Sequence, residues 1–214
     1  THPTTPPVNS PITAMATDVA GNSGTSAVAL TLVVGSSLPT APTLALASDT
    51  GASASDGITS NGQVLVSGLR SGASWQFSIN GGGSWSAGSD ARFTLDAGSY
   101  NVGLVQVRQT DGAGNTSPVG QLAQAVLVDQ AAPGAPGFAL VSDTGASSSD
   151  GLTNNGQINV TGLETGASWQ YSTNSGVSWN SGAGSAFSLG AGGYSANAVQ
   201  VRQIDLAGNV GTAV

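Results

Sequence analysis

The residues of this sequence that can do chemistry are aspartates in glycine-rich loops. Eight of the eleven acidic residues occupy three kinds of place: Asp49, Asp56, Asp143 and Asp150 lie in SDTG-x-S-x-SDG loops, Asp18, Asp111 and Asp205 begin D-x-A-G-N loops, and Asp129 lies in a linker. Calcium takes six to eight hard oxygen ligands at about 2.3–2.6 Å and tolerates irregular geometry. Carboxylates among Asn side chains and backbone carbonyls therefore favour Ca²⁺, whereas zinc would require His or Cys.

A second interpretation of these loops is open. Asp and Asn are common turn formers whose side chains bond to their own backbone, so each loop taken singly is typical of a plain turn. The loops recur, however, in a chain of which only 7% of residues are charged. Several unneutralised carboxylates within a few ångströms repel each other, and a divalent cation removes that repulsion. We therefore predict calcium sites, with the plain turn as the alternative.

The composition speaks against several functional classes. Four arginines and eleven acidic residues give a net charge of −7, so no nucleic-acid partner is expected. The sequence has no Cys, and its one histidine, His2, lies in a Pro/Thr-rich start, which speaks against thiol and His-based catalysis. The nucleophile motif G-x-S-x-G is absent, and no apolar run approaches the ~18 residues of a membrane span. We expect neither an enzyme nor membrane insertion.

Two copies of one unit account for most of the chain. SDTGASASDGITSNGQ (48–63) matches SDTGASSSDGLTNNGQ (142–157), and VQVRQTDGAGN matches VQVRQIDLAGN, each at an offset of 94 residues. TDVAGN (17–22) marks a partial third copy. We predict three domains: the C-terminal strands of a partial repeat (1–34), a full repeat (35–128) and a repeat that lacks its last strand (129–214). We expect the native polypeptide to continue in both directions.

Short β-rich runs fill each repeat. We predict strands at 43–47, 63–69, 74–79, 92–95, 100–110 and 121–128. Alternation in the third run predicts that Trp75, Phe77 and Ile79 share one face. Clusters of Gly, Asn, Asp and Ser between the runs supply turns. Six or seven short strands in about 94 residues, without a helical period, indicate an all-β fold of tandem immunoglobulin-like β-sandwiches in an extended rod.

An immunoglobulin-type topology predicts which acidic loops meet. The loop between the first two strands lies at one end of a sandwich, and the loop between the last two strands lies at the other. We therefore expect one site between consecutive repeats, formed by Asp49, Asp56, Asp129, Asp205 and Asn209. Gly35 stands where Asp129 stands one repeat later, so we expect a weaker or altered site near 34–39.

Two tryptophans end a shared motif. SINGGGSW (78–85) and STNSGVSW (172–179) have the spacing S-x-N-x-G-x-S-W. This resembles the Asp-box turn of sialidases, with Asn80 and Asn174 in place of Asp, and implies a hairpin remote from catalysis. We predict that Asn or Gly adopts the left-handed conformation there and that the tryptophan packs over its hairpin. The alternative is a sugar-stacking role for Trp85 or Trp179.

The whole unit is similar to a known family. V-D-x-x-A-P, SDTG-x-S-x-SDG-x-T, GASWQ(Y/F)S, G-x-S-W and VQVRQ-x-D-x-A-G-N together resemble the bacterial Ig-like repeats of giant RTX-type surface adhesins, which are exported by type I secretion. The resemblance covers about 35–214 and part of the start. It implies tandem extender domains with calcium at their junctions. By position in the motifs it carries calcium ligation to Asp49, Asp56, Asp111, Asn115, Asp129, Asp143, Asp150, Asp205 and Asn209.

The expected function is that of a structural extender in a cell-surface adhesin, outside the bacterial cell, in cell adhesion and biofilm formation. Its partners would be the neighbouring repeats of the same chain, with calcium rigidifying each joint. One alternative is a subunit of an extracellular fibre or surface layer that self-associates by strand exchange. Another is an accessory carbohydrate-binding module.

Overall fold

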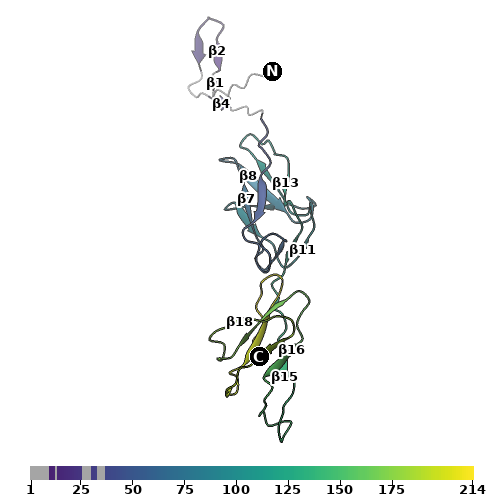
Figure 1. Cartoon of the computed structure of the whole chain (residues 1–214). Coiled ribbons are helices and arrows are strands. Elements are labelled where there is room, and N and C mark those ends of the chain that lie inside the picture. Colours follow the sequence, from purple (N-terminus) through teal and green to yellow (C-terminus); the bar gives the residue numbers. More distant parts are fainter. Residues whose placement is uncertain (1–9, 13, 26–29, 33–36) are drawn as a thin grey trace. The chain divides into compact units, whose positions relative to one another are not determined.

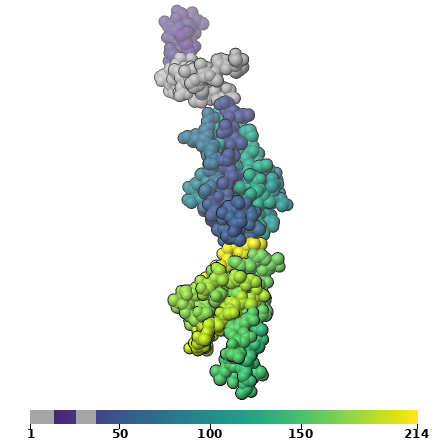
Figure 2. Space-filling model, viewed as in Figure 1, coloured from purple at the N-terminus to yellow at the C-terminus, as the bar shows by residue number. Residues whose placement is uncertain are grey.

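The fold is all-β. A computed structural model describes residues 10–12, 14–25, 30–32 and 37–214, which are coloured in Figure 1. Figure 2 shows a space-filling view in which 14–25 and 37–214 are coloured. This part of the chain forms strands, turns and bends without a helix, so the expected all-β class is confirmed. No helix long and apolar enough to cross a membrane occurs in it. The strands make several small sheets, an arrangement consistent with β-sandwich packing.

Strands of the first full repeat form three sheets (Figure 1). One has the order β10-β7-β5, a second β11-β14-β6 and a third β13-β12-β8-β9. Strands β14 and β6 are parallel, whereas the pairs β10/β7, β11/β14, β13/β12, β12/β8 and β8/β9 are antiparallel. The strands are β5 (Thr43–Leu46), β6 (Ile58–Thr59), β7 (Gln63–Ser67), β8 (Ser74–Ser78), β9 (Ser86–Ala87), β10 (Arg92–Thr94), β11 (Gly98–Tyr100), β12 (Gln106–Thr110), β13 (Gly120–Gln121) and β14 (Val126–Val128).

The second repeat reproduces six of these strands, each 94 residues further along. They form the sheets β15-β16-β19 and β18-β17-β20. The strands are β15 (Gly137–Leu140), β16 (Gln157–Thr161), β17 (Ser168–Ser172), β18 (Asn180–Ser181), β19 (Ala186–Ser188) and β20 (Gln200–Ile204). The same sequence pattern thus forms the same local structure twice.

Four short strands lie near the start of the chain. Strand β1 (Ser10–Ile12) pairs antiparallel with β4 (Leu30–Leu32), and β2 (Met15–Thr17) pairs with β3 (Ser23–Thr25). The TDVAGN segment forms the turn between β2 and β3.

The predicted strands agree with the structure at four places and differ at two. The runs at 43–47, 63–69, 74–79 and 92–95 become β5, β7, β8 and β10 with shorter ends. The run at 100–110 was predicted as one strand, which is wrong, because the chain passes here from the sheet of β11 to that of β12. Gly103, with φ +86°, lies in the turn between them. The run at 121–128 likewise divides into β13 and β14.

Alternation places large apolar side chains in the interior. In the second repeat Ile158, Val160, Trp169, Phe187 and Val201 form a buried cluster. Burying each such side chain contributes about 1.5–3 kcal/mol.

The aromatic face predicted for β8 is only partly correct. Trp75 is buried and contacts Phe77 at a ring-centroid distance of 6.2 Å. Ile79 follows the end of β8 and is 43% exposed. Ser78, on the opposite face of β8 from Trp75, is 2% exposed, and its Oγ accepts the Gly82 N–H in the following turn.

The chain divides into two compact units that do not coincide with the repeats. One comprises Thr1–Leu44, Val66–Ala91 and Gly103–Gln121, and the other comprises Ala45–Leu65, Arg92–Val102 and Leu122–Val214. The second unit therefore contains segments of both full repeats. The domain boundaries at 34/35 and 128/129 remain predictions from the sequence.

Candidate functional site

The D-x-A-G-N loops are closed by their own side chains. Asp111 Oδ1 accepts hydrogen bonds from the backbone N–H groups of Ala113 (2.9 Å) and Asn115 (3.0 Å), and the Asn115 amide donates to Oδ2 at 3.1 Å. Asp18 has the same bonds to Ala20 and Asn22. These carboxylates therefore act as turn formers, as the alternative interpretation predicts.

The same bonds shift the ionisation of two carboxyls. The pKa of Asp111 is lowered, chiefly because the Asn115 side chain donates to the charged form, and Arg70 adds a smaller effect from 3.4 Å. The pKa of Asp18 is lowered by Asn22 in the same way. Both groups are thus held as anions by local donors and already have partners in place of a cation.

The SDTG loops leave one carboxylate oxygen without a partner. Asp49 Oδ2 accepts the Gly57 N–H at 2.8 Å, while Asp49 Oδ1 is buried and has no hydrogen-bond partner. Asp143 repeats this arrangement, with Gly151 as the donor at 2.8 Å. A buried carboxylate oxygen without a donor is costly, so both positions suit an oxygen ligand to a cation.

Within the second compact unit, the first SDTG loop contacts the last D-x-A-G-N loop. The Thr50 hydroxyl donates to the Ala207 carbonyl oxygen at 2.7 Å, and the Ala52 N–H donates to the Leu206 carbonyl oxygen at 3.3 Å. Gly51 lies so close that a Cβ there would meet the Leu206 carbonyl oxygen. This approach explains why the loop carries glycine at 51, with φ +98°.

The linker residue Asp129 joins the same region. Its backbone N–H donates to the Thr59 carbonyl oxygen at 2.9 Å, and the Asn209 amide donates to the Asp129 carbonyl oxygen at 2.8 Å. The Asn209 amide also donates to Asp205 Oδ2 at 2.8 Å. The loops that carry Asp49, Asp129, Asp205 and Asn209 are therefore brought together.

The carboxylates themselves do not form a cluster. Among the described residues, no three acidic or histidine side chains gather closely enough to hold a metal ion. Asp56 and Asp150 are exposed and accept the N–H groups of Ile58 and Leu152, two residues on. The calcium assignment of the nine residues remains a prediction, and the donor chemistry fits it best at Asp49 and Asp143. Gly35 lies outside the described residues.

The tryptophan motif forms a hairpin closed by hydrogen bonds. Asn80 Oδ1 accepts the Ser84 N–H at 2.9 Å, and the Asn80 amide donates to Ser84 Oγ at 2.9 Å. The left-handed residues are not the asparagines but the two that follow each of them, Gly81 and Gly82 in one repeat and Ser175 and Gly176 in the other. The hydrogen bonds recur in the second repeat, which supports a structural role for the motif.

An arginine guanidinium stacks on the ring of each of these tryptophans. The guanidinium carbon of Arg108 lies 4.1 Å from the Trp85 ring centroid, and that of Arg202 lies 4.0 Å from the Trp179 ring centroid. Each arginine also bonds to a glutamine on the neighbouring strand. One ring face is therefore used within the protein, which leaves less of the indole for a sugar.

Two buried glutamines, Gln109 and Gln203, were not predicted from the sequence. Gln109 is fully buried; its amide donates to the carbonyl oxygens of Thr40 (2.8 Å) and Gly68 (3.0 Å), and its Oε1 accepts the Arg70 N–H at 2.7 Å. Gln203 makes the equivalent three bonds. The alternation V-x-V-R-Q contains the signal, because Gln109 shares the inward face of Val107.

Compared with known proteins, the chain matches no protein-family model and no curated protein.

Proposed function

We propose that the chain is a structural extender region of a large bacterial cell-surface adhesin. In this proposal the repeats are tandem immunoglobulin-like β-sandwiches that form an extended rod outside the cell, and calcium rigidifies their junctions. The repeated strands and loops, each displaced by 94 residues, support a modular structural role. The chain would hold a binding domain away from the cell and would itself catalyse nothing.

One observation carries the calcium part of the proposal. Asp49 Oδ1 is buried without a donor, in a loop that contacts the 205–209 loop through Thr50 and Ala207. A divalent cation would supply the missing positive partner, since a carboxylate oxygen is the kind of hard ligand that calcium requires. Asp143 has the same unpartnered oxygen, which implies a matching site in the second copy.

Calorimetry with calcium tests the proposal. We expect saturable binding by the 214-residue chain and a higher melting temperature in calcium than in chelator, since a ligand that binds only the folded state stabilises by about 2.7 kcal/mol at one hundred times its Kd. Asp49→Asn should remove one site and Asp143→Asn the other. Asp90→Asn is the matched control, because Asp90 is exposed, lies outside these loops, and Asn tolerates its φ of +52°.

The extender role has its own measurement. Small-angle scattering should give a larger radius of gyration in calcium than in chelator, because bridged joints restrict bending. An unchanged melting temperature and unchanged scattering in calcium would contradict the calcium part. A compact, globular scattering profile in both conditions would contradict the rod.

A further inference from the structure

The sequence contains three Asn-Gly dipeptides, which begin at Asn61, Asn80 and Asn155. In such a dipeptide the glycine backbone nitrogen attacks the amide carbon of the asparagine side chain, because a residue without a side chain leaves that nitrogen unhindered. The amide nitrogen then leaves as ammonia, so the asparagine is deamidated without an enzyme. The three sites differ in how the fold holds the two reacting groups.

Asn61 is folded back over its own following peptide bond. Its Oδ1 accepts the Gln63 N–H at 3.1 Å, which forms an Asx turn and brings the side-chain amide towards the intervening peptide nitrogen. This hydrogen bond also stabilises the negative charge that develops on Oδ1 during attack. Among the described residues, the Gly62 N–H has no acceptor, so the attacking nitrogen is not held elsewhere.

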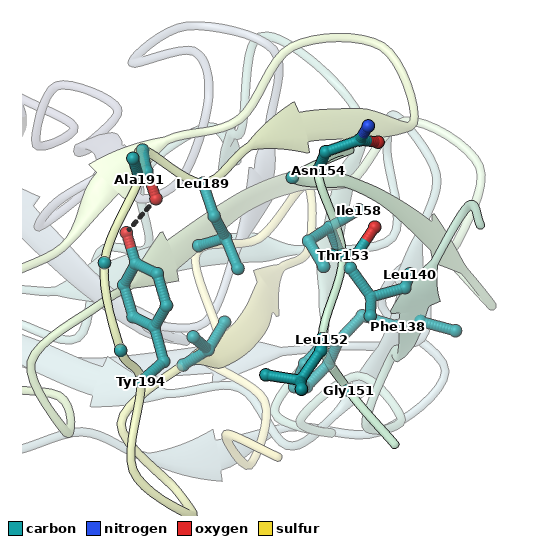
Figure 3. A pocket seen from close by; sticks show the side chains of 16 residues that line it. Phe138, Leu140, Gly151, Leu152, Thr153, Asn154, Ile158, Leu189, Ala191 and Tyr194 are labelled. Carbon is teal, nitrogen blue, oxygen red and sulfur yellow. Dashed lines mark hydrogen bonds between the residues drawn. The ribbon is translucent and has the colours of Figure 1, made fainter. Parts of the chain in front are cut away.

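Asn155 repeats this arrangement in the second copy. Its Oδ1 accepts the Gln157 N–H at 3.1 Å, and within the described part of the chain the Gly156 N–H likewise has no acceptor. Figure 3 shows the two preceding residues, Thr153 and Asn154, beside a pocket that Gly156 also lines. The same local sequence therefore forms the same reactive arrangement twice.

The leaving nitrogen has a hydroxyl beside it at both sites. Asn61 Nδ2 donates to Ser48 Oγ at 2.7 Å. Asn155 Nδ2 donates to Ser142 Oγ at 2.9 Å. A hydroxyl next to the leaving group relays a proton to the departing nitrogen, which is the role of a general acid.

Close packing keeps glycine at both sites. A Cβ on Gly62 would meet the Leu95 carbonyl oxygen. A Cβ on Gly156 would meet the Leu189 carbonyl oxygen. Neither glycine has a positive φ, so the lack of space, and not the backbone conformation, requires glycine here. The fold therefore retains the residue that leaves the attacking nitrogen unhindered.

Asn80 is held differently. Its Oδ1 accepts the Ser84 N–H at 2.9 Å and its Nδ2 donates to Ser84 Oγ at 2.9 Å, so both amide atoms are bonded across the hairpin. The Gly81 N–H donates to the Leu104 carbonyl oxygen at 2.9 Å. Attack by the Gly81 nitrogen would break these bonds, and the tryptophan motif therefore protects its own Asn-Gly dipeptide.

We propose that Asn61 and Asn155 are sites of spontaneous deamidation in the folded chain, and that Asn80 is protected. The glycine nitrogen gives its proton to water and bonds to the asparagine Cγ. The Cγ–Nδ2 bond breaks, and the amide nitrogen takes up a proton and leaves as ammonia. One water molecule then opens the resulting succinimide at either carbonyl, which gives aspartate or isoaspartate without oxidation or reduction.

Deamidation changes the loops that carry the SDTG aspartates. Each product gains a negative charge and loses the amide that donates to Ser48 or Ser142, which directly precede Asp49 and Asp143. Isoaspartate also adds a methylene group to the main chain just ahead of β7 or β16. The proposal does not depend on calcium, and it is tested in chelator so that its result stays separate from the metal proposal.

Peptide mapping of the 214-residue chain by mass spectrometry tests the proposal. Cleavage after the four arginines places Asn61, Asn80 and Asn155 in three different peptides. The folded chain is incubated in mildly alkaline water enriched in heavy oxygen, which labels each newly formed carboxylate. We expect Asn61 and Asn155 to be labelled at least about tenfold faster than Asn80. In urea, where the fold is absent, all three should react at similar rates.

Asn155→Gln is the matched variant, because glutamine must close a larger ring and reacts far more slowly. Its peptide should lose the label while the rate at Asn61 stays unchanged. Label that persists in that peptide would overturn the assignment to Asn155. The proposal is also overturned if Asn80 reacts as fast as Asn61 in the folded chain, or if Asn61 and Asn155 stay unlabelled there after the chain in urea has reacted completely.

Discussion

The Thr50 hydroxyl donates a 2.7 Å hydrogen bond to the Ala207 carbonyl oxygen, across 157 positions of sequence. The same oxygen atom of Thr50 accepts the Ser60 N–H at 2.7 Å. One side chain therefore organises its own loop and joins it to the D-x-A-G-N loop of the following repeat. A neutral hydroxyl therefore makes this link, whereas the sequence motifs predict that the neighbouring aspartates hold the loops together through calcium.

Thr50→Val should destabilise the chain by about 1–3 kcal/mol, because it leaves the part-buried Ser60 N–H and Ala207 carbonyl without their partner. Thr144→Val is the matched control, since Thr144 bonds to Thr153 and Asn154 of its own loop. Hydrogen exchange should show faster exchange of the Ala52 N–H in Thr50→Val only. Equal exchange in both variants would contradict the role of Thr50.

Gln203→Leu should destabilise the second repeat by about 1–3 kcal/mol. The substitution removes three part-buried hydrogen bonds, from the Glu164 N–H to the Gln203 side chain and from the Gln203 amide to the carbonyl oxygens of Gly134 and Gly162. Gln121→Leu, at an exposed position, should change the free energy of unfolding by no more than about 0.5 kcal/mol. Urea denaturation measures both, and similar values for the two variants would show that the glutamine is dispensable.

The lowered pKa of Asp111 predicts that the protein loses stability in acid. The folded pKa of Asp111 lies below the ordinary value of 3.8 because Asn115 donates to the carboxylate. A depressed pKa contributes stability that is present above 3.8 and is lost as pH falls through the folded value. The stability difference between the wild type and Asp111→Asn should therefore be constant from pH 7 to 5 and shrink as the pH falls below the ordinary pKa of 3.8. A difference independent of pH would show that the ionised form is not required.

Arg108→Lys should weaken the hairpin of the tryptophan motif. Lysine keeps the charge but loses the planar stack on Trp85 and the paired bonds to Gln76, so we expect a loss of about 1 kcal/mol. Trp85 fluorescence should shift to the red as the ring becomes more exposed to solvent. Arg92→Lys, at an exposed position, is the control and should change neither quantity.

Much of the fold follows from local pattern. The constant offset predicts that β15 repeats β5 and β20 repeats β12, and alternation predicts that Trp75 faces inward. The breaks at Gly103 and before β14 were not predicted, because they depend on which sheet each segment joins. Period-2 alternation continues through such a crossing, and only the glycine marks it.

The candidate site was predictable in part. Repeat spacing and an assumed topology brought together the loops of Asp49, Asp129 and Asp205, and these loops do contact each other. The partners of each carboxylate were not predictable, because a D-x-A-G-N loop satisfies Asp111 from its own backbone while an SDTG loop leaves Asp49 Oδ1 without a donor. That difference depends on loop conformation, which residue types alone do not determine.

Gly182 is needed because the Trp169 ring leaves no room for a side chain, and not because its backbone conformation favours glycine. A Cβ on Gly182 would meet the ring of Trp169, which is 4% exposed, and Gly88 has the same relation to Trp75. Neither glycine has the positive φ that would itself favour glycine. Gly182→Ala should therefore cost about 1–3 kcal/mol through overpacking.

Gly112→Ala is the matched control, because a Cβ there meets nothing within 4 Å and the backbone again lacks a positive φ. It should be neutral or slightly stabilising, since alanine restricts the unfolded chain. The free energy of unfolding and the near-ultraviolet signal of the tryptophans measure the outcome. Equal stability of Gly182→Ala and Gly112→Ala would show that Trp169 moves aside without cost, and that the glycine is not needed for close packing of the indole.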